Sequence, residues 1–252
     1  MIRNLPLLAT GFIFVAMLLA LPDSGPLFAW IFPGSVPPVY DRGSFVVLAA
    51  SHLALVGAGL GAATVCGMGA AIGVTRPGGQ AAAALVDLIA KTGQSFPPAA
   101  VLAMLVPAVG FGALPTVLAL FAYSLLPITE NTVAGLRGVA PTVREAALGT
   151  GMPPWRILLS IELPLAWPQA LSGIRTAAVV CLGTATIGST VGALTLGTPI
   201  IDGLVTNKPG FVLQGAVPLA FLAVILEMLF TRLEVKESSS FLKKRTKKLF
   251  IL

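Results

Sequence analysis

Long stretches without a charged residue constrain this chain more than any other feature of its sequence. Residues 43–75, 92–129 and 176–201 contain no Asp, Glu, Lys or Arg, and residues 5–21 form a shorter run of the same kind. Each of the three longer stretches exceeds the roughly 20 residues that cross a bilayer as a helix. The runs do not alternate as the strands of a membrane β-barrel do. The sequence therefore predicts an all-α, polytopic membrane protein.

Turn residues and charged segments divide the apolar runs into about six expected transmembrane helices. The third is expected to break at residues 97–98, which are both proline, and to carry Asp87 and Lys91 one turn apart as a possible ion pair. A further half-helix between residues 192 and 210 stays open. The expected spans are residues 6–21, 44–74, 80–109, 113–128, 169–191 and 211–233.

Three regions follow from these spans. The first, residues 1–43, holds one transmembrane helix and a segment rich in Pro and Gly that lies outside the helical pattern. The second, residues 44–233, is a transmembrane core that includes a polar segment between the fourth and fifth spans. The third, residues 234–252, is a basic tail that is expected to lie against anionic lipid headgroups.

The positions of the basic residues predict the orientation of the chain. Most of the 16 Lys and Arg residues fall on one side of the expected topology. Only Arg42 and Lys208 fall on the other side, while Lys91 and Arg175 lie inside their spans. Because Lys and Arg concentrate in cytoplasmic loops, both termini are expected in the cytoplasm. The net charge of +6 thus indicates orientation in a membrane rather than binding to nucleic acid.

The polar segment between the fourth and fifth spans has the pattern of two short helices. Thr142 and Glu145 have the spacing of a capping box at the start of a helix, and Gly151 is placed to end that helix in a left-handed conformation. Either proline of residues 153–154 can open a second helix, which residues 163–164 are expected to close. The pattern predicts a helix, a glycine turn and a second helix.

Residues 141–164 also resemble the EAA loop of the permease subunits of binding-protein-dependent ABC importers. The resemblance implies that the first part of the loop docks on an ATP-hydrolysing subunit and that the last part anchors the loop to the membrane helices. An alternative is that the acidic residue and the glycine are only helix caps. The matching positions are Glu145, Ala146, Ala147 and Gly151 for docking, and Ile161, Leu163 and Pro164 for anchoring.

A wider resemblance, from about residue 52 to residue 233, is to the permeases for glycine betaine, choline and other osmoprotectants. One pair of residues departs from that pattern, because Thr129-Glu130 stands before Asn131 where an apolar residue and an arginine are expected. The residues that carry this resemblance are Leu126-Pro127-Ile128, Asn131-Thr132, Gly135-Leu136-Arg137-Gly138-Val139, Gly173-Ile174-Arg175-Thr176-Ala177 and Gly183-Thr184-Ala185-Thr186-Ile187.

The resemblance implies a non-catalytic subunit of an ATP-driven importer in the bacterial inner membrane, which forms the path of a quaternary-amine osmoprotectant such as glycine betaine or choline. The chain has no glycine-rich loop ending in Gly-Lys-Ser or Gly-Lys-Thr, so ATP and Mg²⁺ are expected on a partner and no cofactor on this chain. The implied partners are two copies of an ABC ATPase, a second or related permease, a periplasmic or lipid-anchored solute-binding protein, and membrane lipid.

The translocation path is marked less clearly than the loop. Ser and Thr in membrane helices often bond to their own backbone or to a neighbouring helix, so packing competes with a role in the path. A cation within a span is costly without a partner or a task, although a long side chain can also reach the interface. The candidates for the path are Tyr123, Arg175, Thr184, Thr186 and Ser189.

Other functions fit the sequence less well. An importer of another solute, such as an amino acid or an inorganic anion, is the main alternative. A channel or an ion-coupled carrier would place acidic residues or broken helices at the midplane of the membrane. A membrane enzyme would need a catalytic group, yet His52, Cys66 and Cys181 lie apart in the sequence. Neither a catalytic residue nor a metal site is therefore expected.

Overall fold

The computed structural model describes residues 5–249, with side chains for residues 5–234 other than those at 80 and 93. Within this described part the chain is helical and contains no β-strand, which confirms the predicted all-α class. The five helices that are long and apolar enough to cross a membrane are Leu5–Asp23, Phe45–Thr75, Ala113–Arg137, Pro154–Val191 and Pro209–Glu234. The prediction of about six spans is close, and the difference lies in the third.

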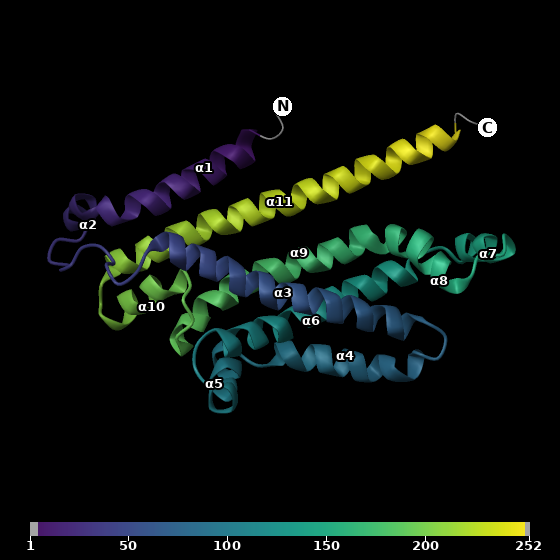
Figure 1. Cartoon of the computed structure of the whole chain (residues 1–252), viewed down its shortest axis with the longest axis horizontal. Helices are drawn as coiled ribbons and strands as arrows, with labels where there is room; N and C mark the ends of the chain where they lie inside the picture. The colour runs from purple at the N-terminus through teal and green to yellow at the C-terminus, as the bar shows by residue number, and fades with distance from the viewer. Residues whose placement is uncertain (1–4, 250–252) are drawn as a thin grey trace. The chain divides into compact units, whose positions relative to one another are not determined.

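The helices follow one another with short connections, and Figure 1 labels most of them. In chain order they are α1 (Leu5–Ala20), η2 (Leu21–Asp23), α2 (Gly25–Ile31), α3 (Phe45–Thr75), α4 (Gln80–Ser95), α5 (Pro98–Val109), α6 (Ala113–Arg137), α7 (Pro141–Gly149), α8 (Pro154–Ile157), the π-helical turn η3 (Leu158–Glu162), α9 (Leu163–Ile187), η4 (Gly188–Val191), α10 (Gly197–Val205) and α11 (Pro209–Leu249).

Prolines explain two differences from the expected spans. The third expected span consists of α4 and α5, because Pro97 caps the start of α5 and Pro98 occupies its first position, where a proline fits a helix best. The segment expected to lie outside the helical pattern contains the short helix α2, which has Pro26 in its first turn. The half-helix left open after residue 192 is present as α10.

Contacts group the chain into two units, and the first consists of Met1–Leu60, Phe96–Phe121 and Ala178–Leu229. Its main core is built from buried apolar side chains of helices that are distant in sequence. The members include Phe14 and Leu18 of α1, Phe45 of α3, Leu120 of α6, Cys181 of α9, Leu196 and Phe211. This burial holds α1 to the rest of the first unit.

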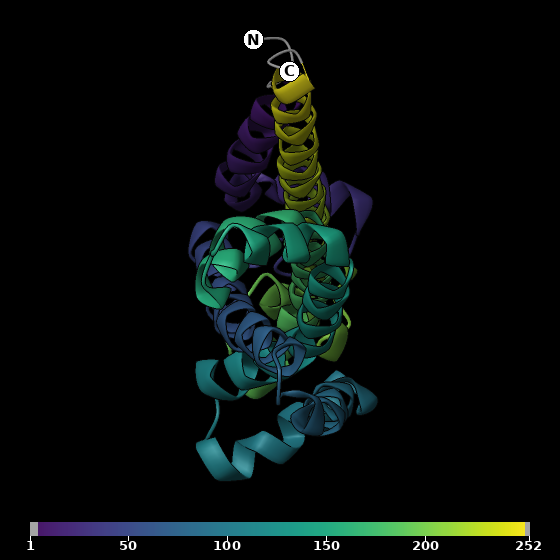
Figure 2. The same ribbon diagram turned by 90° about the vertical axis from the view of Figure 1, so that its right-hand side faces the viewer.

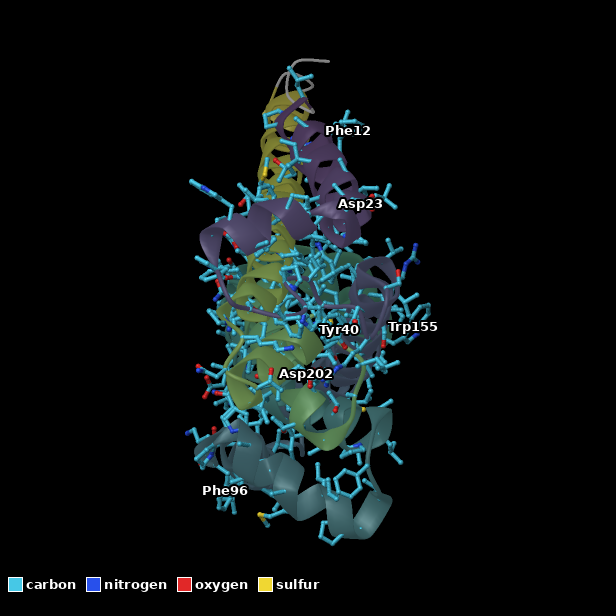
Figure 3. The ribbon with its side chains drawn as sticks, turned by 90° about the vertical axis from the view of Figure 1, so that its left-hand side faces the viewer. Phe12, Asp23, Tyr40, Phe96, Trp155 and Asp202 are labelled. Carbon is cyan, nitrogen blue, oxygen red and sulfur yellow. The ribbon has the colours of Figure 1, made fainter. Side chains whose placement is uncertain are left out.

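The segment before α3 is held by side chains of α10 and α11. The fully buried amide of Gln214 accepts a hydrogen bond from the backbone N–H of Tyr40 at 2.8 Å. Its nitrogen donates to the carbonyl oxygen of Pro38 at 3.2 Å. Asp202, labelled together with Tyr40 in Figure 3, pairs with Arg42 at 3.2 Å. These bonds fix residues 38–42 against the end of the first unit that contains α10.

The second unit consists of Gly61–Ser95, Ala122–Ala177 and Phe230–Leu252. Helix α4 lies beside α6 in it (Figure 1), and the predicted pair Lys91–Asp87 is present at 2.8 Å. Pro127 has no N–H, so the carbonyl oxygen of Tyr123, one turn earlier in α6, loses its helical partner. Gln94 of α4 replaces it by donating a hydrogen bond to that oxygen at 2.6 Å.

Small residues let α6 and α9 approach closely in the second unit. A Cβ atom on Gly173 would lie 2.5 Å from the carbonyl oxygen of Pro127 and 2.7 Å from Cβ of Asn131. Close backbone approach at glycine is a common way to pack helices in membranes. Beside this contact, Gln169 of α9 donates to Oδ1 of Asn131 at 2.8 Å. The osmoprotectant-type residues at positions 127, 131 and 173 thus form a contact between two helices.

Candidate functional site

The first arm of the polar loop is α7. The helix begins at Pro141 with Ala140 at the cap position, and no side chain bonds to the cap. The predicted capping box of Thr142 and Glu145 is therefore wrong, because the fixed φ of Pro141 places the cap at Ala140, two residues before Thr142. The end is as predicted. Gly151 has a φ of 78°, and the N–H groups of Gly151 and Met152 donate to Leu148 and Ala147, a Schellman motif.

The second arm begins as predicted and ends differently. Helix α8 starts at Pro154, with Pro153 at the cap. We expected Leu163 and Pro164 to close this arm, but they form the first turn of α9. The π-helical turn η3 joins α8 to α9 without a break in the helical path, so Pro164 lies inside a continuous helix, directly after this irregular turn. The loop therefore runs directly into the fifth span, and α7 and α8 face the viewer in Figure 2.

One face of α7 is exposed and carries small residues beside a single glutamate. Its members follow helical spacing and are Thr142, Glu145, Ala146 and Gly149. Ala147 points the other way and is only 6% exposed. The first part of the EAA-type motif is thus divided between an outward surface and an inward packing contact. We call Thr142, Glu145, Ala146 and Gly149 the outer face of α7.

Large apolar side chains flank the outer face. Leu148 is 55% exposed and Trp155 of α8 is 65% exposed; Figure 3 labels Trp155. Of the predicted anchoring residues, Ile161 and Leu163 are half-buried and Pro164 is exposed. Apolar groups exposed around small residues are typical of a surface that binds another protein.

A buried carboxylate lies behind α7. Glu162, at the end of η3, is 3% exposed. Its Oε2 accepts a hydrogen bond from Nη1 of Arg76 at 2.6 Å, and its Oε1 lies 2.6 Å from Nε of Arg144 on α7. Arg144 also donates from Nη2 to the carbonyl oxygen of Leu136, near the end of α6. We call Arg76, Glu162 and Arg144 the Glu162 triad.

Sequence reasoning missed the Glu162 triad. The available signal was an acidic residue standing alone between the matching positions Ile161 and Leu163, in a stretch that is otherwise mostly apolar. A charge at such a position is rarely buried unless it is paired. Its partners could not be named, because Arg76 lies 86 residues away in the sequence.

The five residues expected to line a path are distributed over both units. Tyr123 and Arg175 belong to the second unit, and Thr184, Thr186 and Ser189 belong to the first. Thr186 donates to its own helix at the carbonyl oxygen of Leu182, and Ser189 shares a hydrogen bond with Thr195 at 2.7 Å. Such bonds within the chain are what hydroxyl groups make when they serve helix packing and not a solute path. The role of these five residues in a path stays a prediction.

Arg175 has a partner that explains a cation within a span. Its Nη1 lies 2.6 Å from Oε2 of Glu234 on α11, and both side chains are about one-third exposed. A paired charge is much less costly in a membrane helix than a single one. The cations expected to bind headgroups, at positions 243–248, lie outside the described side chains.

A cavity of about 480 Å³ lies between α4 and α6 in the second unit. Glu130, the departure from the osmoprotectant pattern, is exposed and lines it together with Asp87 and Arg137. A second cavity, of about 680 Å³, lies beside α7 and is lined by Val143, Gly138 and other residues. Both lie at the end of the second unit that carries the loop.

Comparison with solved structures supports the fold. An inward-facing structure of the MetNI methionine ABC transporter matches 76% of this chain and 95% of the compared chain, with a TM-score of 0.66 and 20% sequence identity. An amino acid ABC transporter crystallised with histidines matches 79% of this chain and 92% of the compared chain, with a TM-score of 0.57 and 19% identity.

Characterised relatives are closer in sequence. The osmoprotectant import permease protein OsmY of Salmonella typhimurium is 40% identical over 178 residues, which are 71% of this chain and 75% of that protein. The glycine betaine/carnitine/choline transport system permease protein OpuCB of Bacillus subtilis is 35% identical over 185 residues, which are 73% of this chain and 83% of that protein. The choline transport system permease protein OpuBB of the same organism is 35% identical over 184 residues.

A family model agrees with these matches. It describes the inner membrane component of binding-protein-dependent transport systems and matches residues 63–236, which include the whole α7–α8 loop, the Glu162 triad and the α6–α9 contact. The exposed outer face of α7, the helical fold and the family match lead to one conclusion: this chain belongs to the family of binding-protein-dependent transport system inner membrane components, the permease subunits of ABC importers.

Proposed function

We propose that this permease carries a quaternary ammonium osmoprotectant, such as glycine betaine, carnitine or choline, and that it receives its energy from a separate ATPase that docks on the outer face of α7. Of the relatives that match most of the chain, one is named for osmoprotectant import at 40% identity, and two are named for glycine betaine, carnitine or choline at 35% identity. The likeness to the methionine transporter and to the amino acid transporter lies at 19–20% identity and concerns the fold.

The observation that carries the docking proposal is the outer face of α7. Thr142, Glu145, Ala146 and Gly149 are all exposed, and small residues let another backbone come close. The Schellman turn at Gly151 gives the helix a defined end, and the packing of Ala147 with the ion pair of Arg144 sets the direction of the face. A helix of this kind transmits movement better than a flexible loop does.

We infer how the partner proteins are arranged around this subunit from the docking proposal and from the positions of the basic residues. The outer face of α7 lies in the cytoplasm together with both termini, because Lys and Arg concentrate on that side. Two ATPases bind Mg²⁺ and ATP, a second permease copy or a related chain completes the path, and a solute-binding protein delivers the solute on the opposite side. Because Arg42 is one of the two cations expected outside the cytoplasm, we assign residues 38–42, which bond to Gln214, to that opposite side.

Solute uptake tests this proposal. The permease, its ATPase and its binding protein are produced in cells that lack their own osmoprotectant transporters, and uptake of labelled glycine betaine, choline, carnitine, methionine and histidine is compared. We expect uptake of at least one quaternary ammonium compound, and loss of that uptake when the ATPase cannot hydrolyse ATP. Uptake of methionine or histidine alone would identify an amino acid importer. Uptake that continues when the ATPase cannot hydrolyse ATP would identify a carrier.

A further inference from the structure

The Glu162 triad joins the ends of four helices in the second unit. Arg76 is the first residue after α3, Arg144 lies in α7, and Glu162 directly precedes α9. The bond from Arg144 to the carbonyl oxygen of Leu136 adds the end of α6. One buried carboxylate therefore connects the candidate docking helix with three of the helices that are long enough to span a membrane.

Stability alone does not explain an ionic group at this position. Removing two or three charges from water is costly, and well-packed apolar side chains of similar volume often stabilise a protein equally well or better. What an ionic network adds is geometry, because one carboxylate oxygen accepts a hydrogen bond from Arg76 while the other forms an ion pair with Arg144. The short distances, both 2.6 Å, fit a contact that fixes the position of α7 relative to α3 and α9.

The ion pairs of the Glu162 triad lie beside a cavity, where few apolar contacts hold α7. A cavity of about 460 Å³ lies between α7, α8 and the turn after α3, and it is lined by Leu148, Pro154 and Ile157 together with the triad. Apolar contact between α7 and the helix ends is thus incomplete on this side. The triad crosses the gap, and the π-helical turn that ends in Glu162 is a local irregularity of the kind often found at functional positions.

We propose that Glu162 is a positioning residue for energy coupling: through Arg144 and Arg76 it transmits the displacement of α7 to α3 and α9. This inference rests on the proposed docking of an ATPase on α7. It assigns to Glu162 no contact with the ATPase or with the solute. Without the carboxylate, α7 keeps its outer face and still binds the ATPase, but its movement is taken up in the cavity instead of reaching the spans.

The test compares Glu162→Gln with the unchanged permease in lipid vesicles that contain the complete transporter with its ATPase and binding protein. Three quantities are measured: recovery of the ATPase with the permease, the rate of ATP hydrolysis, and solute taken up per ATP hydrolysed. We expect full recovery of the ATPase, continued hydrolysis, and a decrease of about tenfold in solute per ATP, as for residues that couple distant sites.

Three further variants separate positioning from stability. Glu162→Asp keeps the charge and is expected to restore most of the uptake per ATP. The double variant Glu162→Gln with Arg144→Gln is expected to be no worse than either single variant, because the two residues act through one contact. Asp202→Asn removes a carboxylate from the more exposed pair with Arg42 in the first unit and is expected to leave the ratio unchanged.

Two results would overturn the proposal. One is an assembled Glu162→Gln complex with normal uptake per ATP. The other is loss of the folded permease or of the bound ATPase in both Glu162→Gln and Arg144→Gln, which would assign the triad to stability or to docking. If the unchanged permease recovers no ATPase, the docking proposal itself fails, so the two failures can be told apart.

Discussion

Replacing Ala146 by arginine is expected to abolish ATP-driven uptake while the chain remains folded and inserted. Ala146 is exposed in the middle of the outer face of α7, so the longer side chain can extend into solvent, and stability should change by less than about 0.5 kcal/mol. In a docked complex the same side chain would prevent close approach and bury an unpaired charge. That costs about 3 kcal/mol or more, roughly a hundredfold in affinity.

Two neighbouring tests make this prediction specific. Ala147→Arg changes the adjacent alanine, which is buried, so we expect it to lower thermal stability in detergent as well as uptake. Ala82→Arg places the same charge on an exposed alanine at the start of α4, and uptake should continue. Uptake and melting temperature are measured for all three. Normal uptake with Ala146→Arg would remove α7 as the docking element.

Gly173→Ala is expected to destabilise the permease by about 2 kcal/mol, within the range for overpacked contacts. The added Cβ would lie 2.5 Å from the backbone oxygen of Pro127. A backbone oxygen cannot rotate away as a flexible side chain can, so α6 and α9 must move apart. The hydrogen bond between Gln169 and Asn131, beside this contact, is expected to weaken with them. The measurement is the thermal unfolding of the purified chain in detergent.

Gly183 on the same helix supplies the matched control. A Cβ atom built there meets nothing within 4 Å, and alanine is a better helix former than glycine by about 0.5–1 kcal/mol. We therefore expect Gly183→Ala to have a melting temperature equal to or above that of the unchanged chain. Equal melting temperatures for both alanine variants would contradict the close α6–α9 contact.

The apolar runs predicted the helices well because long uncharged segments have few alternatives in a membrane. Their ends were harder to predict. The cap of α7 is Ala140 and not Thr142. Two adjacent start signals competed, and the proline at position 141 prevailed. Leu163 and Pro164 looked like a stop, but they directly follow the π-helical turn η3 inside a continuous helical path, so the chain continues as helix through the proline.

The outer face of α7 was only partly predictable. The motif identified Glu145, Ala146 and Ala147 as a group, but a motif does not say which side chains point outward. That depends on the rotation of the helix, which the packing of Ala147 and the ion pair of Arg144 determine. The Glu162 triad was not predictable for the same reason, because it joins residues that only the folded chain brings together.

The local bonds of Gln94 show a further limit of sequence reasoning. The sequence assigns this polar residue no partner, yet its amide replaces the hydrogen bond that Pro127 removes from α6. The proline and the glutamine lie on different helices, and the exchange depends on their distance in the fold. Polar residues in spans therefore need their partners identified before a path is assigned.

The central claim is that this permease works with a separate ATPase through α7. Its most direct test is purification of the chain from native membranes in mild detergent, followed by identification of the proteins that accompany it and by measurement of ATP hydrolysis. We predict that an ATPase is recovered and that hydrolysis rises when the solute-binding protein and a quaternary ammonium solute are added. Isolation of a transport-active chain without any ATPase would contradict the claim.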